Sequence, residues 1–117
     1  VRFADRARAG GTRVVLTTIT PSAAGAHGTP QAIATRDAVN GWVRAHGAEH
    51  ADAVADFAAA VADPAAPSRL APAFDSGDGL HLSAAGHRAL AGALDPAVLT
   101  GSPCLDGGPS RVLVSGP

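Results

Sequence analysis

An aspartate precedes a histidine by three positions in residues 75–81, which read DSGDGLH. At this spacing the Asp78 carboxylate can accept the Nδ1 hydrogen of His81, which fixes the imidazole tautomer and leaves Nε2 free to take a proton from a nucleophile. The two residues are therefore a candidate for the acid–base half of a hydrolytic triad, with His81 as general base and Asp78 as the acid that orients it.

The same residues also allow less reactive roles. An Asp-Gly dipeptide is common in turns, and a histidine beside it can simply start a helix, so the motif alone leaves both interpretations open. Asp75 also precedes the histidine, but six residues make a looser tether, and we expect Asp75 to shape a turn. A metal site built from Asp75, Asp78 and His81 is the least favoured interpretation, because one short loop lacks the second cluster that would complete the coordination.

The sequence shows no clear nucleophile. Ser76 is the nearest serine, but it shares a loop with His81, whereas a nucleophilic serine is expected on a separate strand–helix turn. His27 could border a substrate pocket, although a solvated loop position is favoured for it. We expect no chemistry from the remaining histidines, His46, His50 and His87.

The first half of the chain predicts a strand followed by a helix. Residues 13–19 are rich in β-branched side chains and continuous enough in hydrophobicity to indicate a buried parallel strand, ended by Pro21. Thr29 and Pro30 then supply an N-cap and a first-turn proline for a helix that we expect to run to about His46 and to end at Gly47. Its predicted apolar face, with Trp42 in the core, consists of Ile33, Val39, Trp42 and Val43.

The second half predicts a further strand and a last helix. Residues 52–57 read as a short strand, 58–62 as a turn of helix, and the proline-rich residues 64–72 as a surface crossing. A helix is expected over 83–94, capped by Ser83, with Leu90, Ala93 and Leu94 inward and Gly86 at a close approach to a neighbour. Because strands and helices alternate, the fold class is α/β with parallel strands, and ligands are expected at the carboxyl ends of those strands.

Composition limits the partners. The chain has 117 residues, a net charge of −1 and no lysine, so it lacks the basic stripe of a nucleic-acid-binding protein. No apolar run approaches the ~20 residues of a transmembrane segment. Aromatic residues make up only 3%, and a core of small side chains should be thin. Cys104 is the single cysteine, so no disulfide can form within the chain.

Several short segments together resemble one known family. The segment DGLH at 78–81 is followed by Gly86 and preceded by ADF at 55–57, DP at 63–64 and DSG at 75–77. Over residues 13–94 this arrangement resembles the last block of the SGNH hydrolases, also called GDSL esterases and lipases. Departures from the family pattern are Leu82 and Ser83, where the family has proline and asparagine.

This resemblance implies a fold, an activity and a site. The fold would be the C-terminal part of a three-layer α/β/α, flavodoxin-like SGNH domain, and the activity would be hydrolysis of a small-molecule, glycan or lipid ester without metal or cofactor. Asp78 and His81 would be the catalytic pair, and Asp56 would make structural hydrogen bonds.

The family's Gly-Asp-Ser nucleophile block and its oxyanion-hole blocks have no counterpart in the sequence. We therefore expect residues 1–96 to be the C-terminal half of an SGNH domain, inactive alone and partnered by an N-terminal half, and residues 97–117 to be a tail or linker with an edge strand near 111–114. A noncatalytic binding or scaffold module is the alternative. The compartment stays open, and secretion is compatible with the sequence.

Overall fold

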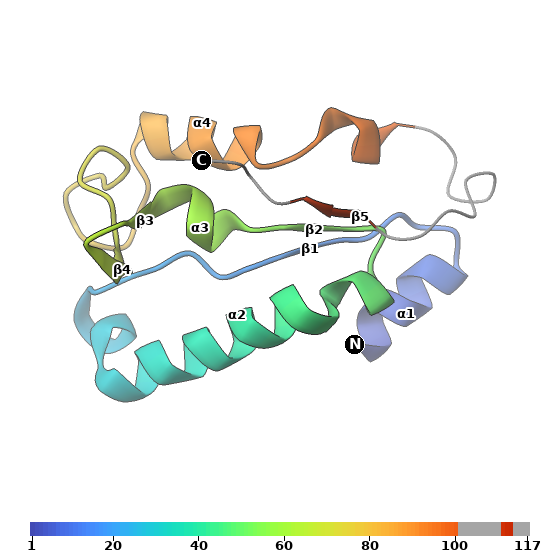
Figure 1. The fold of residues 1–117 in the computed structure, drawn as a ribbon, viewed down its shortest axis with the longest axis horizontal. Helices are drawn as coiled ribbons and strands as arrows, with labels where there is room; N and C mark the ends of the chain where they lie inside the picture. Colours follow the sequence, from blue (N-terminus) through green and yellow to red (C-terminus); the bar gives the residue numbers. More distant parts are fainter. Residues whose placement is uncertain (101–110, 114–117) are drawn as a thin grey trace.

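The centre of the fold is a parallel β-sheet. A computed structural model describes residues 1–100 and 111–113. Strands β1 (Val15–Thr17), β2 (Ala53–Ala55) and β5 (Arg111–Leu113) pair in the order β1-β2-β5, all parallel, with Leu16 opposite Val54 (Figure 1). The α/β class with parallel strands is therefore confirmed, and so is a strand near residue 111. The rest of the predicted tail, residues 101–110 and 114–117, lies outside the described residues.

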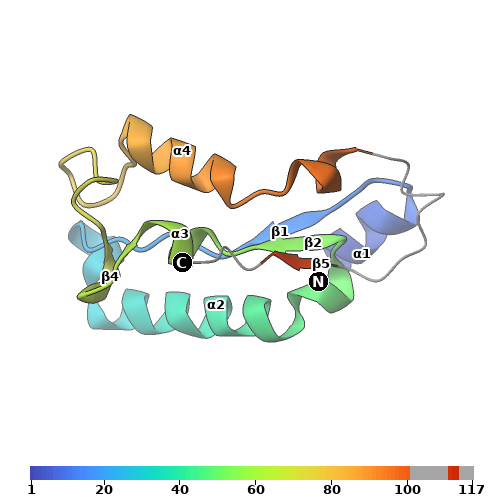
Figure 2. The same cartoon turned by 45° about the horizontal axis from the view of Figure 1, so that its top comes forward.

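Helices cover the sheet on two sides. The strands lie between the long helix α2 (Pro30–His50) and helix α4 (Ala84–Gly92) in both views, which gives the three layers expected of the fold (Figures 1 and 2). The other helical elements are α1 (Arg2–Ala9), the 3₁₀ turns η1 (Gly25–Gly28) and η2 (Pro96–Leu99), and the short helix α3 (Phe57–Val61).

Helix α2 starts as predicted but ends later. The Thr29 hydroxyl accepts a hydrogen bond from the Ala32 N–H at 3.2 Å, and Pro30 occupies the first turn. The predicted end at Gly47 is wrong, because the helix continues to His50. Gly47 is buried, and a Cβ there would lie 2.8 Å from Val54 Cγ2, so this glycine lets the helix approach the sheet.

The predicted apolar face of α2 is right at Val43, which is buried, and wrong at two other positions. Val39 and Trp42 are exposed by 41% and 39%, so Trp42 is not a core residue. Asn40 is buried instead because its amide pairs with the chain after β1: Oδ1 accepts from the Ile19 N–H at 2.7 Å and Nδ2 donates to the Ile19 carbonyl at 2.8 Å. The buried positions of the helix are Arg36, Asn40, Val43 and Gly47.

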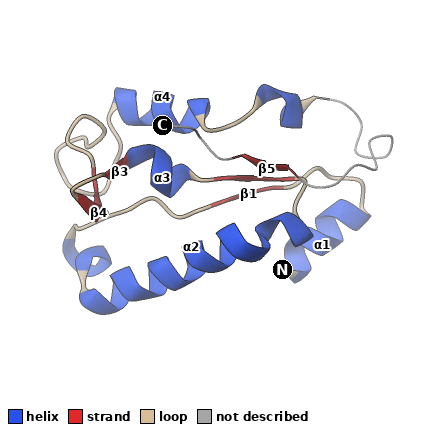
Figure 3. Cartoon of the chain, viewed as in Figure 1, coloured by secondary structure: helices blue, strands red, loops and turns tan. Residues whose placement is uncertain are grey.

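The proline-rich stretch forms a hairpin where a surface crossing was predicted. Strand β3 (Ala62–Asp63) pairs antiparallel with β4 (Ala66–Leu70), apart from the main sheet (Figure 3). Proline is compatible with this pairing because Pro64 lies in the turn and a two-stranded hairpin consists of edges only. Hairpin strands therefore replace the predicted irregular segment.

The described core is built from small side chains, as the composition indicates. Ala51, Ala53, Ala55 and Val61 have no exposed surface, and Leu70 is the largest of the buried apolar residues. Beyond the predicted boundary at residue 96, Val98 is buried and its carbonyl accepts a hydrogen bond from Arg13. No helix within the described part of the chain is long and apolar enough to cross a bilayer.

Candidate functional site

The loop formed by residues 75–81, hereafter the Asp-His loop, lies at the carboxyl end of the parallel sheet. The Gly79 carbonyl accepts hydrogen bonds from the Ser22 hydroxyl at 3.1 Å and from the Ala23 N–H at 3.2 Å, and both residues belong to the segment after β1. Figure 1 shows the loop at the end of the molecule toward which β1 and β2 run. This is the edge at which α/β proteins place ligand sites.

Asp78 and His81 are in direct contact. The carboxylate oxygen Oδ2 of Asp78 lies 2.5 Å from Nδ1 of His81. Both side chains face solvent, with exposed fractions of 49% for Asp78 and 74% for His81. The imidazole thus turns outward, and its Nε2 is accessible to a group brought to this edge.

The other oxygen of Asp78 is held by the loop backbone. Oδ1 accepts from the N–H groups of Leu80 at 2.9 Å and His81 at 2.8 Å, and from the Ser76 hydroxyl at 3.3 Å. The hydrogen bond with the His81 side chain, followed by those with the His81 and Leu80 N–H groups, holds the pKa of Asp78 far below its ordinary value of 3.8. Asp78 therefore remains a carboxylate well into the acid range.

Asp75 shapes the loop, as expected of a turn residue. Its Oδ1 accepts from the N–H groups of Gly77 at 2.8 Å and Gly79 at 3.0 Å, and the Ser76 N–H closes the loop by donating to the His81 carbonyl at 2.9 Å. Within the described residues, no group of three His, Cys, Asp or Glu side chains is arranged to hold a metal ion.

Gly79 is required by the backbone of this loop. Its φ of 73° lies in the left-handed region, while an added Cβ would make ordinary contact with Ala24 Cβ at 3.7 Å. We expect Gly79→Ala to lower the free energy of unfolding by about 1 kcal/mol, through backbone strain and not through a clash. Urea denaturation measures this change, and Gly92→Ala, in open space on α4, is the control. An unchanged Gly79→Ala midpoint would contradict the role of the left-handed turn.

Helix α4 fixes the far end of the loop. The Ser83 hydroxyl caps the helix by accepting from the Gly86 N–H at 3.2 Å, as predicted, and also donates to the Ala73 carbonyl at 2.9 Å. Gly86 makes the predicted close approach, since a Cβ there would lie 2.7 Å from the Phe74 carbonyl oxygen. The helix start is thus pressed against the segment that leads into the loop.

Asp56 follows β2 and ties the strand ends together. Its carboxylate accepts from the Thr18 hydroxyl at 2.8 Å, from Nε and Nη2 of Arg44 at 2.7 and 3.0 Å, and from the Ala59 N–H at 3.1 Å. Burial by itself raises the pKa of Asp56, but the hydrogen bonds from Arg44, Thr18 and Ala59 outweigh it and bring that pKa below the ordinary value. These contacts fit the structural role that the resemblance implied.

The other histidines lie on three helical elements, η1, α2 and α4. His27 is exposed in η1, and His87 is exposed on α4. His46 and His50 bond to Glu49 and Asp5.

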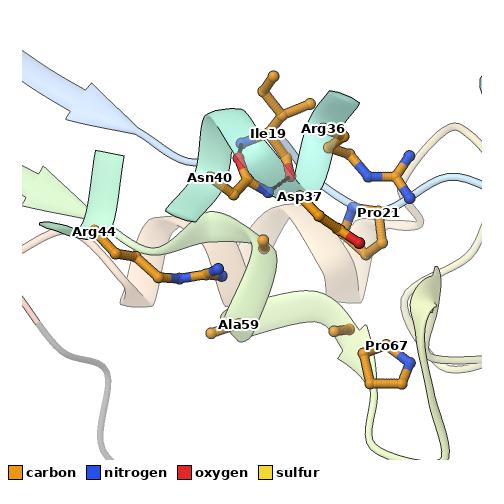
Figure 4. Close-up of a pocket in the computed structure, with 10 residues that line it drawn as sticks. Ile19, Pro21, Arg36, Asp37, Asn40, Arg44, Ala59 and Pro67 are labelled. Atoms are coloured by element: carbon orange, nitrogen blue, oxygen red, sulfur yellow. Dashed lines mark hydrogen bonds between the residues drawn. The ribbon is translucent and has the colours of Figure 1, made fainter. Parts of the chain in front are cut away.

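A hollow that the sequence did not predict lies between α2 and α3. It has a volume of about 190 Å³, and Figure 4 shows Arg36, Asp37, Asn40 and Arg44 along one wall, with Ala59 and Pro67 opposite. Neither Asp78 nor His81 lines it. The signal that could have found it is the spacing of polar residues at 36, 40 and 44, one helical turn apart on one side of α2.

The chain matches the model of one protein family and is similar in fold to a solved structure. The model of the GDSL-like lipase/acylhydrolase family matches residues 2–89. A solved structure from Bacteroides fragilis NCTC 9343, described as a "putative acylhydrolase", is 23% identical with a TM-score of 0.58; the alignment covers 84% of this chain and 47% of that one. The chain thus spans about half the length of that protein. No curated protein sequence matches the chain.

Proposed function

Because the chain belongs to the GDSL-like lipase/acylhydrolase family, we propose that it supplies the general base and the orienting acid of a serine ester hydrolase. The observation that carries this proposal is the contact between Asp78 Oδ2 and His81 Nδ1, which engages one ring nitrogen and leaves a mostly exposed imidazole at the sheet edge where α/β proteins place ligand sites. The substrate class is a carboxylic ester, either a small molecule or an ester of a glycan or lipid.

The proposed reaction begins with proton transfer to His81. A serine hydroxyl attacks the ester carbonyl while Nε2 of His81 takes the hydroxyl proton, and the Asp78 carboxylate stabilises the resulting imidazolium through Nδ1–H. His81 then returns the proton to the oxygen of the departing alcohol, which leaves an acyl-serine. Water, deprotonated by the same Nε2, hydrolyses the acyl-serine to the acid and regenerates the serine.

The nucleophile is proposed to come from an N-terminal half of the domain. Within residues 1–100, the His81 ring forms its side-chain hydrogen bond with Asp78, and no serine hydroxyl bonds to the ring. The backbone N–H donors for the oxyanion would come from the same half. This chain alone is therefore expected to be inactive.

A fluorophosphonate probe tests the proposal on the complete gene product. An activated serine displaces fluoride from phosphorus and becomes covalently labelled, so we expect one labelled serine, detectable by intact mass and peptide mapping. Labelling should be lost in His81→Ala and retained in His87→Ala, which removes an exposed histidine of α4. Labelling that is independent of His81 would contradict the assignment.

A noncatalytic binding or scaffold module is the second candidate. The observation that favours it is that no serine hydroxyl in the described part of the chain hydrogen-bonds to the His81 ring, since the nearby Ser76 hydroxyl donates to Asp78 Oδ1 instead. A complete gene product that is folded but never labelled by the probe would favour this module over the hydrolase.

A further inference from the structure

We infer that Ser22 and Arg36 are positioning residues that hold the Asp-His loop against the segment after β1 and so set the angle between Asp78 and His81. This inference deepens the proposed function and rests on it. The side-chain hydrogen bonds of Ser22 and Arg36 go to backbone groups and not to Asp78 or His81. Their effect would pass through the Gly79 peptide, which lies between the two members of the pair.

Ser22 holds the loop from the side of the sheet. It is only 4% exposed, its hydroxyl donates to the Gly79 carbonyl at 3.1 Å, and the same oxygen accepts from the Ala24 N–H at 3.4 Å. The Ala23 N–H gives the Gly79 carbonyl a second hydrogen bond at 3.2 Å. Two donors from one segment thus fix a single carbonyl oxygen of the loop.

The Gly79 peptide is also held from inside the loop. Its N–H donates to Asp75 Oδ1 at 3.0 Å, and its φ is 73°. Asp78 precedes Gly79 in the chain, and its carboxylate accepts hydrogen bonds from the N–H groups of Leu80 and His81, which follow Gly79. A rotation of the Gly79 carbonyl would therefore disturb the hydrogen bonds that orient the carboxylate.

Arg36 fixes Ser22 in turn. It is 8% exposed, and its Nη1 and Nη2 donate to the carbonyls of Ser22 at 3.1 Å and Ser68 at 3.2 Å (Figure 4 shows the side chain leaving α2 beside Pro21). Among residues 1–100 no carboxylate forms an ion pair with Arg36. Its buried hydrogen bonds therefore go to backbone, and one guanidinium joins α2, the segment after β1 and the β4 hairpin strand.

The variant Ser22→Ala tests this inference with little disturbance of packing. Loss of one hydrogen bond should raise the amide hydrogen-exchange rates of Leu80 and His81 about fivefold, with the amide of Val54 in β2 unchanged. The pH at which the Asp78 carboxyl titrates, followed by carbon-13 NMR, should move up toward that of an ordinary aspartate. In the complete enzyme, kcat should fall about fivefold with KM unchanged.

A second pair of variants separates positioning from folding. Arg36→Lys cannot reach both carbonyls, so we expect the same local acceleration of exchange. Asn40 is one helical turn away and also buried, and its side chain bonds to Ile19 alone among the residues that the structure describes. Asn40→Ala should therefore leave the Leu80 and His81 rates unchanged relative to Val54. Wild-type rates in Ser22→Ala, or an equal rise at all three amides, would overturn the inference.

The exchange and titration measurements do not require an active enzyme. If they change as expected while the fluorophosphonate probe labels nothing, the anchoring is real and the proposed hydrolase is wrong. If labelling succeeds and the loop amides of Ser22→Ala are unaffected, the hydrolase stands and Ser22 is not a positioning residue.

Discussion

Replacing His81 with alanine in the complete enzyme is expected to lower kcat for a short-chain aryl ester about 10⁴-fold. The variant loses the base that deprotonates the serine and the acid that protonates the leaving oxygen, so both chemical steps slow, while residual turnover comes from substrate binding and oxyanion stabilisation. Because the His81 side chain is 74% exposed, its removal should leave the unfolding midpoint nearly unchanged.

The matched control is His87→Ala, which removes another exposed imidazole, from α4. It should retain wild-type kcat and KM. Equal losses in the two variants would point to a nonspecific effect, and wild-type turnover by His81→Ala would reject the general-base role.

Asp78→Asn is the companion change at the other member of the pair. An amide can still hydrogen-bond to Nδ1 but does not balance the imidazolium charge, so we expect a loss in kcat equal to or smaller than that of His81→Ala. Because the pKa of Asp78 lies far below its ordinary value, protonation of Asp78 should not form the acid limb of the wild-type pH–rate profile. An acid limb that follows Asp78 titration would contradict this.

Replacing Asp56 with alanine is expected to lower the free energy of unfolding by about 2–3 kcal/mol. The change removes the N-cap of α3, which contributes about 1 kcal/mol, and leaves the Thr18 hydroxyl, 2% exposed, without its acceptor. The lost ion pair adds little, because the Arg44 side chain is 47% exposed. Urea denaturation followed by circular dichroism measures the change.

Asp37→Ala controls for the charge. Asp37 is an exposed carboxylate on the same helix as Arg44 and also raises the pKa of Arg44, but neither caps a helix nor contacts Thr18. We expect a loss below about 0.5 kcal/mol in this variant. If both variants lose the same stability, electrostatics rather than the hydrogen bonds would explain the effect of Asp56.

The pH dependence of the free energy of unfolding gives a further test of the role of Asp56. The pKa of Asp56 is lowered in the folded protein, so its contribution is present above the ordinary aspartate pKa of 3.8 and is lost as the pH falls through the folded value. Asp56→Ala should therefore lose less stability than the wild type on acidification below pH 3.8. A steeper acid dependence in the variant would contradict the hydrogen-bond assignment.

Local signals in the sequence predicted much of this structure. The Thr29-Pro30 and Ser83 helix starts, the strand in residues 13–19 and the close approach at Gly86 each depend on a few neighbouring residues, and the structure confirms them. Strand β1 covers only Val15–Thr17, however, and its residues are half-buried or exposed, so the predicted burial of this strand is wrong. The contact of Asp78 with His81 is similarly local, since only two residues of the loop lie between them. Their catalytic role remains a prediction.

The errors arise where distant backbone decides burial. Hydropathy placed Trp42 in the core, but Trp42 is exposed. The polar side chains Arg36 and Asn40 are buried because they satisfy carbonyl and N–H groups of the chain after β1. In the sequence, Gly47 indicates a helix end, whereas in the structure it lies within the helix and allows close packing against Val54 of β2. The hollow between α2 and α3 likewise exists only once these elements are assembled.

The position of Trp42 determines what fluorescence can report. It is the only tryptophan, the chain has no tyrosine, and its ring lies 5.8 Å from those of His46 and His50, the latter bonded to Asp5 of α1. Emission excited at a tryptophan wavelength therefore senses the end of the molecule where α1 meets α2, opposite the Asp-His loop (Figure 1). A melting curve recorded by tryptophan fluorescence would report local changes at that end. Local unfolding of the loop around His81 would go undetected unless a second fluorophore were introduced there.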